Sequence, residues 1–153
     1  MVTEADVLAK WQQIQGDNET LLFLVGGAGS GKSKILRDLS EQDGWKLIEA
    51  KDLIDEEFLE YAREERPEKA PAAVSATLRA CNGKVVLIDS VQVLFSPILN
   101  IPAFELLKRI STQFPLIVGW RGSFDGKQLH LEHCGNEKYA SFDVEYPEHI
   151  MEV

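Results

Sequence analysis

The stretch Leu21–Leu36, LLFLVGGAGSGKSKIL, joins an apolar run to a helical pattern through a glycine-rich turn. Residues 21–25 are all apolar, which is typical of a buried strand, and apolar residues recur at helical spacing from Ile35 to Leu39. Between them, residues 26–33 follow the pattern G-x-x-x-x-G-K-[ST], which is meaningful when a strand precedes it and a helix follows. Because both are predicted here, we interpret residues 26–33 as a phosphate-binding loop, or P-loop.

Each residue type in this loop suits the binding of phosphate. Glycines allow positive φ and a close approach to an anion, so that successive backbone N–H groups can surround phosphates. The N-terminus of the following helix, expected near Lys32, favours a bound polyphosphate through its unpaired N–H groups and its dipole. Lys32 is expected to reach the β- and γ-phosphates, and the Ser33 hydroxyl is expected to ligate the Mg²⁺ that bridges them. The predicted nucleotide contacts are made by Gly26, Gly27, Ala28, Gly29, Ser30, Gly31, Lys32, Ser33 and Lys34.

A second apolar run, Lys84–Asp89 (KVVLID), ends in an acid and is typical of a buried parallel strand. In open α/β sheets ligands lie outside the carboxyl ends of the strands, where both Lys32 and Asp89 would fall. Asp89 is therefore the predicted partner of Ser33 in holding Mg²⁺, directly or through water.

Arg121 follows a third apolar run, Leu116–Trp120. An arginine at the carboxyl end of a strand can stabilise charge on the γ-phosphate, in its own site or in that of a neighbouring subunit. A surface arginine paired with a nearby acid is an equally good interpretation. The predicted catalytic set is Lys32, Asp89 and Arg121.

Length and composition indicate one ordinary globular domain, with 153 residues, 44% apolar and 27% charged. We divide it into an N-terminal helix (1–16), a nucleotide-binding core (20–131) and a C-terminal extension (132–153). No apolar run is long enough to span a membrane and the first residues lack a secretory pattern, so a cytoplasmic protein is expected. Cys81 and Cys134 are expected to be reduced thiols, because they lie far apart without metal-binding spacing.

The net charge of −9 opposes general binding to nucleic acid. The net charge does not exclude a local basic patch at Lys32, Lys34 and Arg37, through which DNA could bind. The acidic run 51–69 is interpreted as a solvated helix face.

Patterns elsewhere predict further elements. Thr3 is expected to cap the first helix, and a strand is expected at 45–50. Further helices are expected from Asp52 to just before Pro67, over 71–80 and from Pro102 to about Gln113. Asp125-Gly126 predicts a hairpin turn into 128–131, and a last edge strand is expected at 141–146.

Over residues 21–131 the chain resembles the P-loop ATPases of the AAA+ and RecA-like group. That resemblance implies an α/β fold in three layers, with a mostly parallel five-stranded sheet in the order 5-1-4-3-2. It also implies ATP with Mg²⁺ and assembly into a homo-oligomer. A C-terminal helical lid is not expected, because too little chain follows the last core strand.

More narrowly, VVLIDSVQVLF, FELLKRIS, GWRGSFDGKQLHLE and GNEKY resemble the small P-loop proteins of type 3 BREX phage-defence systems, the BrxF family. This implies other defence-system proteins as partners. One departure from AAA+ ATPases is Ser90, which follows Asp89 where those enzymes usually carry a water-activating glutamate.

The expected function is therefore ATP binding with weak or partner-activated hydrolysis in a DNA-directed defence complex. The alternatives are a nucleotide-gated DNA-binding or scaffolding module without turnover, and a small-molecule or nucleoside kinase.

Overall fold

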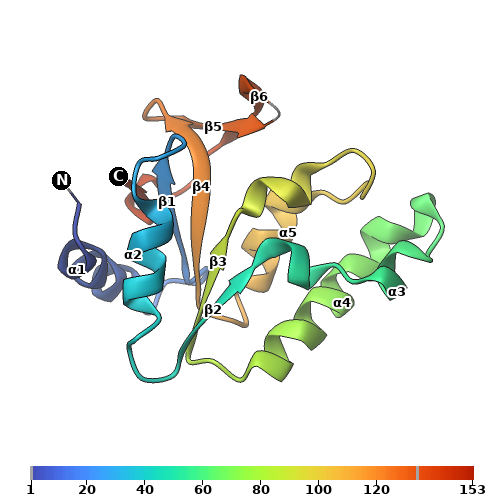
Figure 1. Cartoon of the computed structure of the whole chain (residues 1–153), viewed down its shortest axis with the longest axis horizontal. Coiled ribbons are helices and arrows are strands. Elements are labelled where there is room, and N and C mark those ends of the chain that lie inside the picture. Colours follow the sequence, from blue (N-terminus) through green and yellow to red (C-terminus); the bar gives the residue numbers. More distant parts are fainter. Residues whose placement is uncertain (1, 134) are drawn as a thin grey trace.

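Parallel strands form the centre of the molecule, in an α/β fold (Figure 1). The computed structural model describes residues 2–133 and 135–153. In this part of the chain one seven-stranded sheet runs through the molecule. Its strands are β1 (Leu21–Gly26), β2 (Trp45–Glu49), β3 (Val85–Asp89), β4 (Leu116–Phe124), β5 (Gln128–His133), β6 (Asn136–Asp143) and β7 (Ile150–Glu152).

The parallel part of the sheet has the order β2-β3-β4-β1-β7. Counted in chain order, its five strands follow the expected order 5-1-4-3-2. β1 lies between β4 and β7, with Gly26 opposite Arg121 and Phe23 opposite Ile150. Residues 132–153 therefore do not stand apart from the core, because they supply the strand that borders β1.

Helices cover both faces of the sheet (Figure 1). α1 (Glu4–Ile14) and α2 (Lys32–Leu39) lie on one face, and α3 (Glu56–Leu59), α4 (Arg66–Cys81) and α5 (Ala103–Ile110) lie on the other. Alternate residues of β1 separate the two cores, because Leu22 packs with α1 and α2 whereas Phe23 packs with α4 and α5. No helix in residues 2–133 and 135–153 is long and apolar enough to cross a membrane.

The first helix is confirmed, with a capping box between Thr3 and Asp6. The continuous helix expected from Asp52 is wrong. The chain there forms two 3₁₀ turns, Ala50–Leu53 and Arg63–Glu65, with the short α3 between them.

Local capping explains this break. The Asp55 carboxylate accepts the backbone N–H of Phe58 at 2.8 Å, which starts a new helix instead of continuing an old one. α4 in turn begins at Arg66, five residues before the expected start at 71, because Pro67 suits its first turn. Cys81 at its end is a free thiol, and Cys134 lies outside the described residues.

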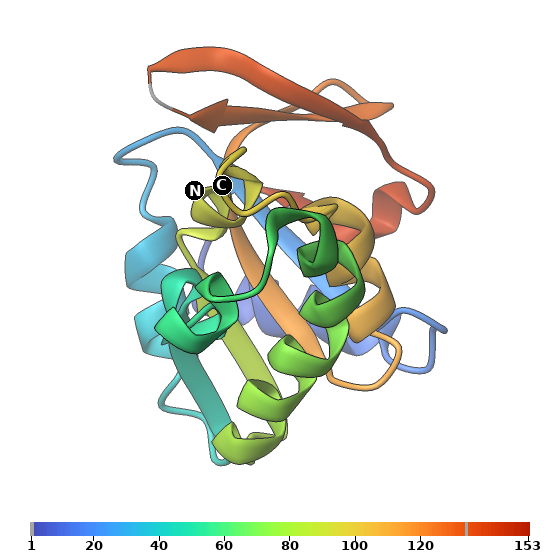
Figure 2. The same cartoon turned by 90° about the vertical axis from the view of Figure 1, so that its right-hand side faces the viewer.

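β4 does not end at Trp120 as expected but continues to Phe124 and pairs antiparallel with β5. This pairing needs Gly122, whose φ is 157° and where an added Cβ would meet the carbonyl oxygen of His130 at 1.8 Å. Asp125 and Gly126 form the expected turn, and the next strand, β6, lies at 136–143 rather than 141–146. Figure 2 shows the β5–β6 hairpin crossing over the carboxyl end of the parallel sheet.

Candidate functional site

The loop between β1 and α2 has a backbone that requires glycine. Gly29 and Gly31 have φ of 76° and 98°, in the left-handed region that other residues rarely adopt. At Gly26 an added Cβ would lie 2.5 Å from the Ser30 hydroxyl oxygen. The loop therefore holds its concave shape only with this sequence.

Lys32 lies inside that concavity and is only 9% exposed. Its ammonium donates to the carbonyl oxygens of Gly26 and Gly27, both at 2.8 Å, and to the Ser30 hydroxyl at 3.1 Å. Burial lowers the pKa of Lys32, Asp89 partly opposes this effect, and Arg121 adds to it. A bound anion would relieve both the desolvation and the repulsion between the two cations.

Ser33 and Asp89 meet across the sheet, as predicted. The Ser33 hydroxyl donates to Asp89 Oδ2 at 2.7 Å. The backbone N–H of Ser90 donates to Asp89 Oδ1 at 2.8 Å, which fixes the carboxylate, and Ser90 itself has a left-handed backbone with φ of 59°. One hydroxyl and one carboxylate beside a phosphate-binding loop are the oxygen ligands that Mg²⁺ prefers.

For Arg121 the structure shows the second interpretation, an arginine paired with a nearby acid, and the role at a γ-phosphate stays a prediction. One of its terminal nitrogens, Nη2, lies 3.3 Å from Glu132 Oε1 on the neighbouring strand β5. Its Nε is buried and has no hydrogen-bond partner in the part of the chain that the structure describes. The arginine is thus held by an acid through Nη2, while its buried Nε is unpaired among the described residues.

These groups surround one pocket of about 170 Å³ at the carboxyl ends of β1, β3 and β4. Its walls are Ala28, Gly29, Lys32, Ser33, Asp89, Ser90, Gln92, Gly119 and Arg121. The predicted catalytic set therefore lies together. Lys34 does not join it, because its exposed side chain forms an ion pair with Asp38 at 2.9 Å. That ion pair also reduces the charge of the expected basic patch.

Two wall residues were missed from the sequence. Gly119 makes room for its neighbours, since an added Cβ would meet Leu36 Cδ1 at 3.1 Å and Asp89 Oδ1 at 3.2 Å. A glycine inside a strand pattern is itself a sign of such close approach. Gln92 presents a buried side-chain oxygen, Oε1, without a partner among the described residues. Nothing in its sequence context distinguishes it.

A wider groove adjoins the loop on its other side. It has a volume of about 630 Å³, and its lining includes Thr3, Ser30, Gly31, Lys34, Ile35 and Val153. The glycine loop thus lines two cavities, a small polar one through Ala28 and Gly29 and a large, mostly apolar one through Ser30 and Gly31. Phosphates and an attached nucleoside would need this combination.

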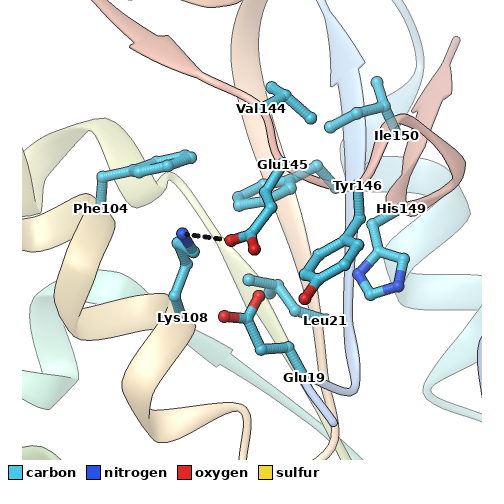
Figure 3. Close-up of a pocket in the computed structure, with 10 residues that line it drawn as sticks. Glu19, Leu21, Phe104, Lys108, Val144, Glu145, Tyr146, His149 and Ile150 are labelled. Atoms are coloured by element: carbon cyan, nitrogen blue, oxygen red, sulfur yellow. Dashed lines mark hydrogen bonds and ion pairs between the residues drawn. The ribbon is translucent and has the colours of Figure 1, made fainter. Parts of the chain in front are cut away.

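A further cavity lies between α5 and the segment before β7 (Figure 3). Its volume of about 20 Å³ is enough for roughly one water molecule. Lys108 and Glu145 lie 3.5 Å apart across it, and burial raises the pKa of Glu19 in its wall. It is too small for a nucleotide, and its residues instead pack the C-terminal segment against β1.

Comparison with protein-family models, curated proteins and solved structures found no match for the chain. What the chain shows is an α/β fold with a mostly parallel sheet, compatible with a P-loop nucleotide-binding protein. Its function is argued from the site.

Proposed function

We propose that this protein binds ATP with Mg²⁺ and is a weak or partner-activated ATPase of the P-loop class. The observation that carries the proposal is the contact of Ser33 with Asp89 at 2.7 Å, next to the buried ammonium of Lys32. Lys32 and Ser33 begin helix α2 and Asp89 ends strand β3, and they converge beside a glycine loop whose backbone can surround phosphates. Such an arrangement is costly to bury and fits a bound anion and cation together.

Each group has a role in this proposal. Gly26–Ser33 surrounds the phosphates, Lys32 neutralises the β- and γ-phosphates, and Arg121 lies near the γ-phosphate. Ser33 and Asp89 hold Mg²⁺, which would neutralise phosphate charge. The apolar groove beside Ser30 and Gly31 would receive the nucleoside.

Ser90 supports slow hydrolysis. In this position it contributes a backbone N–H that fixes Asp89, and its hydroxyl is a far weaker base than a carboxylate. The same observation favours a second candidate, a nucleotide-gated scaffold that binds ATP without turnover. Persistent unhydrolysed ATP in the purified protein would support the scaffold, and steady phosphate release would exclude it.

The wider role that we propose is that of a nucleotide-controlled component of a DNA-directed phage-defence complex of the BREX type. The support is the resemblance of VVLIDSVQVLF and GWRGSFDGKQLHLE to BrxF proteins. The proposed partners are further copies of this chain, other defence-system proteins, and DNA at a local basic patch.

Lys32→Ala tests nucleotide binding. We expect the affinity for ATP–Mg²⁺ to fall by about 100-fold, because a charge-assisted contact to phosphate is lost. Titration calorimetry measures this change. Lys84→Ala is the matched control, since Lys84 is an exposed lysine on the approach to β3, and it should bind ATP normally. An affinity in the Lys32 variant within about threefold of the wild-type value would refute the proposal.

Assembly is tested separately. The mass in solution is measured with and without ATP–Mg²⁺ and DNA, together with phosphate release. We expect a mass that depends on nucleotide. A constant monomer that transfers phosphate to an acceptor would point instead to a kinase.

A further inference from the structure

Two polar atoms stand out in the wall of the 170 Å³ pocket. Gln92 Oε1 and Arg121 Nε are both buried, and neither has a hydrogen-bond partner among the described residues. Leaving such an atom unpaired costs about 1–3 kcal/mol, so buried polar atoms nearly always have a partner. An acceptor and a donor without partners, on two residues that line one pocket, indicate that a hydrogen-bonding molecule completes the site.

The fold holds Gln92 in this position. The left-handed backbone of Ser90 turns the chain out of β3 and into a 3₁₀ helix, Val91–Phe95. Val91 and Leu94 of that helix are fully buried, which leaves Gln92 on the side that faces the pocket. The glutamine is therefore placed by the turn at Ser90, three residues after the proposed Mg²⁺ ligand Asp89.

Arg121 is fixed from the opposite side. Glu132 lies on β5, and its Oε1 holds Arg121 Nη2 at 3.3 Å. Because Gly122 pairs with Leu131, Arg121 and Glu132 face each other across the antiparallel ladder. This contact occupies Nη2 of the guanidinium, and Nε stays without a hydrogen-bond partner among the described residues.

We propose that Gln92 positions the water that attacks ATP, in place of the carboxylate that is absent at Ser90, while Arg121 Nε donates to the γ-phosphate. The inference rests on the proposed ATP site and adds a residue to it. An amide oxygen can accept a hydrogen bond from water and so direct a lone pair at phosphorus, as glutamine does in some other P-loop enzymes.

The reaction balances without a protein base. The water oxygen forms a bond to the γ-phosphorus, the bond from that phosphorus to the β–γ bridging oxygen breaks, and its electron pair stays on ADP. One water proton passes to a γ-phosphate oxygen, so the released phosphate carries both protons until solvent takes one. Gln92 orients the water and accepts no proton, which accounts for slow turnover.

The test uses the whole protein loaded with ATP labelled at the γ-phosphate, in single-turnover reactions started with Mg²⁺. ATP affinity is measured in parallel by calorimetry. For Gln92→Leu we expect hydrolysis to slow by about 10- to 100-fold with ATP affinity changed less than about twofold. Gln92→Glu, which keeps the acceptor oxygen, should restore the rate to the wild-type value or above.

Gln128→Ala is the matched control, because Gln128 lies on the hairpin, its amide donates to Asp143, and it does not line the pocket. Thermal melting confirms that each variant is folded. A wild-type rate in Gln92→Leu, or a loss in Gln92→Glu as large as in Gln92→Leu, overturns the role of Gln92. Wild-type protein that binds ATP but never hydrolyses it overturns this inference and leaves ATP binding standing. Absence of binding overturns the proposed function itself.

Discussion

At the scale of single residues, Gly119 leaves the space that the Asp89 carboxylate occupies. An added Cβ there would press on the buried Leu36 and on Asp89 Oδ1, at 3.1 and 3.2 Å. Asp89 cannot move freely, because the Ser90 N–H and the Ser33 hydroxyl hold its two oxygens.

For Gly119→Ala we therefore expect a strain of about 1–2 kcal/mol in the folded protein and a displaced Asp89 carboxylate. The part of the ATP affinity that depends on Mg²⁺ should fall by about 10-fold. Calorimetry with Mg²⁺ and with a chelator separates the Mg²⁺-dependent part of the ATP affinity from the Mg²⁺-independent part. Equal Mg²⁺ dependence in variant and wild type would contradict this prediction.

Some residues of the candidate site can be predicted from the sequence and others cannot, for a physical reason. Lys32 and Ser33 belong to a continuous motif, and Asp89 ends an apolar strand, so local patterns suffice to find them. Gln92 depends on the direction in which Ser90 turns the chain, which no short pattern encodes. Lys34 directly follows the motif, but its side chain pairs with Asp38, one helical turn away.

At the scale of elements, the turn of the β4–β5 hairpin is held by Asp125. Its Oδ1 accepts the backbone N–H groups of Lys127 and Gln128, each at 2.8 Å, and its Oδ2 lies 3.0 Å from His130 Nε2. The backbone hydrogen bonds, with a smaller contribution from His130, lower the pKa of Asp125 to about 2.

A carboxylate with a lowered pKa stabilises the fold above its unfolded pKa of about 4, and this contribution is lost as pH falls through about 2. Asp125→Asn should therefore be less stable than wild type at neutral pH, and the difference should shrink between about pH 4 and pH 2. Urea unfolding at a series of pH values measures it. A difference that stays constant with pH would contradict the assignment.

Strands that are a single apolar run are predicted well from the sequence. Segments in which the pattern changes part of the way along are not. β1 and β3 are continuous apolar runs, and both lie where expected. The region after Asp52 has helical periodicity, but the cap at Asp55 divides it. The strand predicted at 116–120 is shorter than β4, because the apolar residues end at Trp120. The backbone pairing with β5 continues to Phe124.

At the scale of the whole molecule, a side-chain contact helps to hold residues 149–153 against the turn before β1. His149 is 4% exposed, and its Nε2 lies 2.9 Å from Asp17 Oδ2 in the turn before β1. This contact and the parallel pairing hold β7 beside β1, and the Val153 N–H donates to the Val25 carbonyl oxygen at 2.7 Å.

His149→Ala should lower the free energy of unfolding by about 1–3 kcal/mol, through lost packing and a lost hydrogen bond. A double-mutant cycle with Asp17→Ala isolates the pair, for which we expect a coupling energy of about 1 kcal/mol. Denaturant unfolding provides the four values. Additive effects would show that the two side chains do not stabilise each other.

The strand β7 could not be predicted, because Ile150–Glu152 is too short to show alternation. Its pairing with β1 brings together the two ends of the chain, and β1 is the strand that leads into Gly26. During synthesis β1 emerges early and acquires β7 only after everything between them has left the ribosome. Contacts so distant in sequence form late in folding. The glycine loop after β1 would therefore reach its final rigidity only after β7 has been made, and under the proposed function a nascent chain should capture nucleotide only from that point.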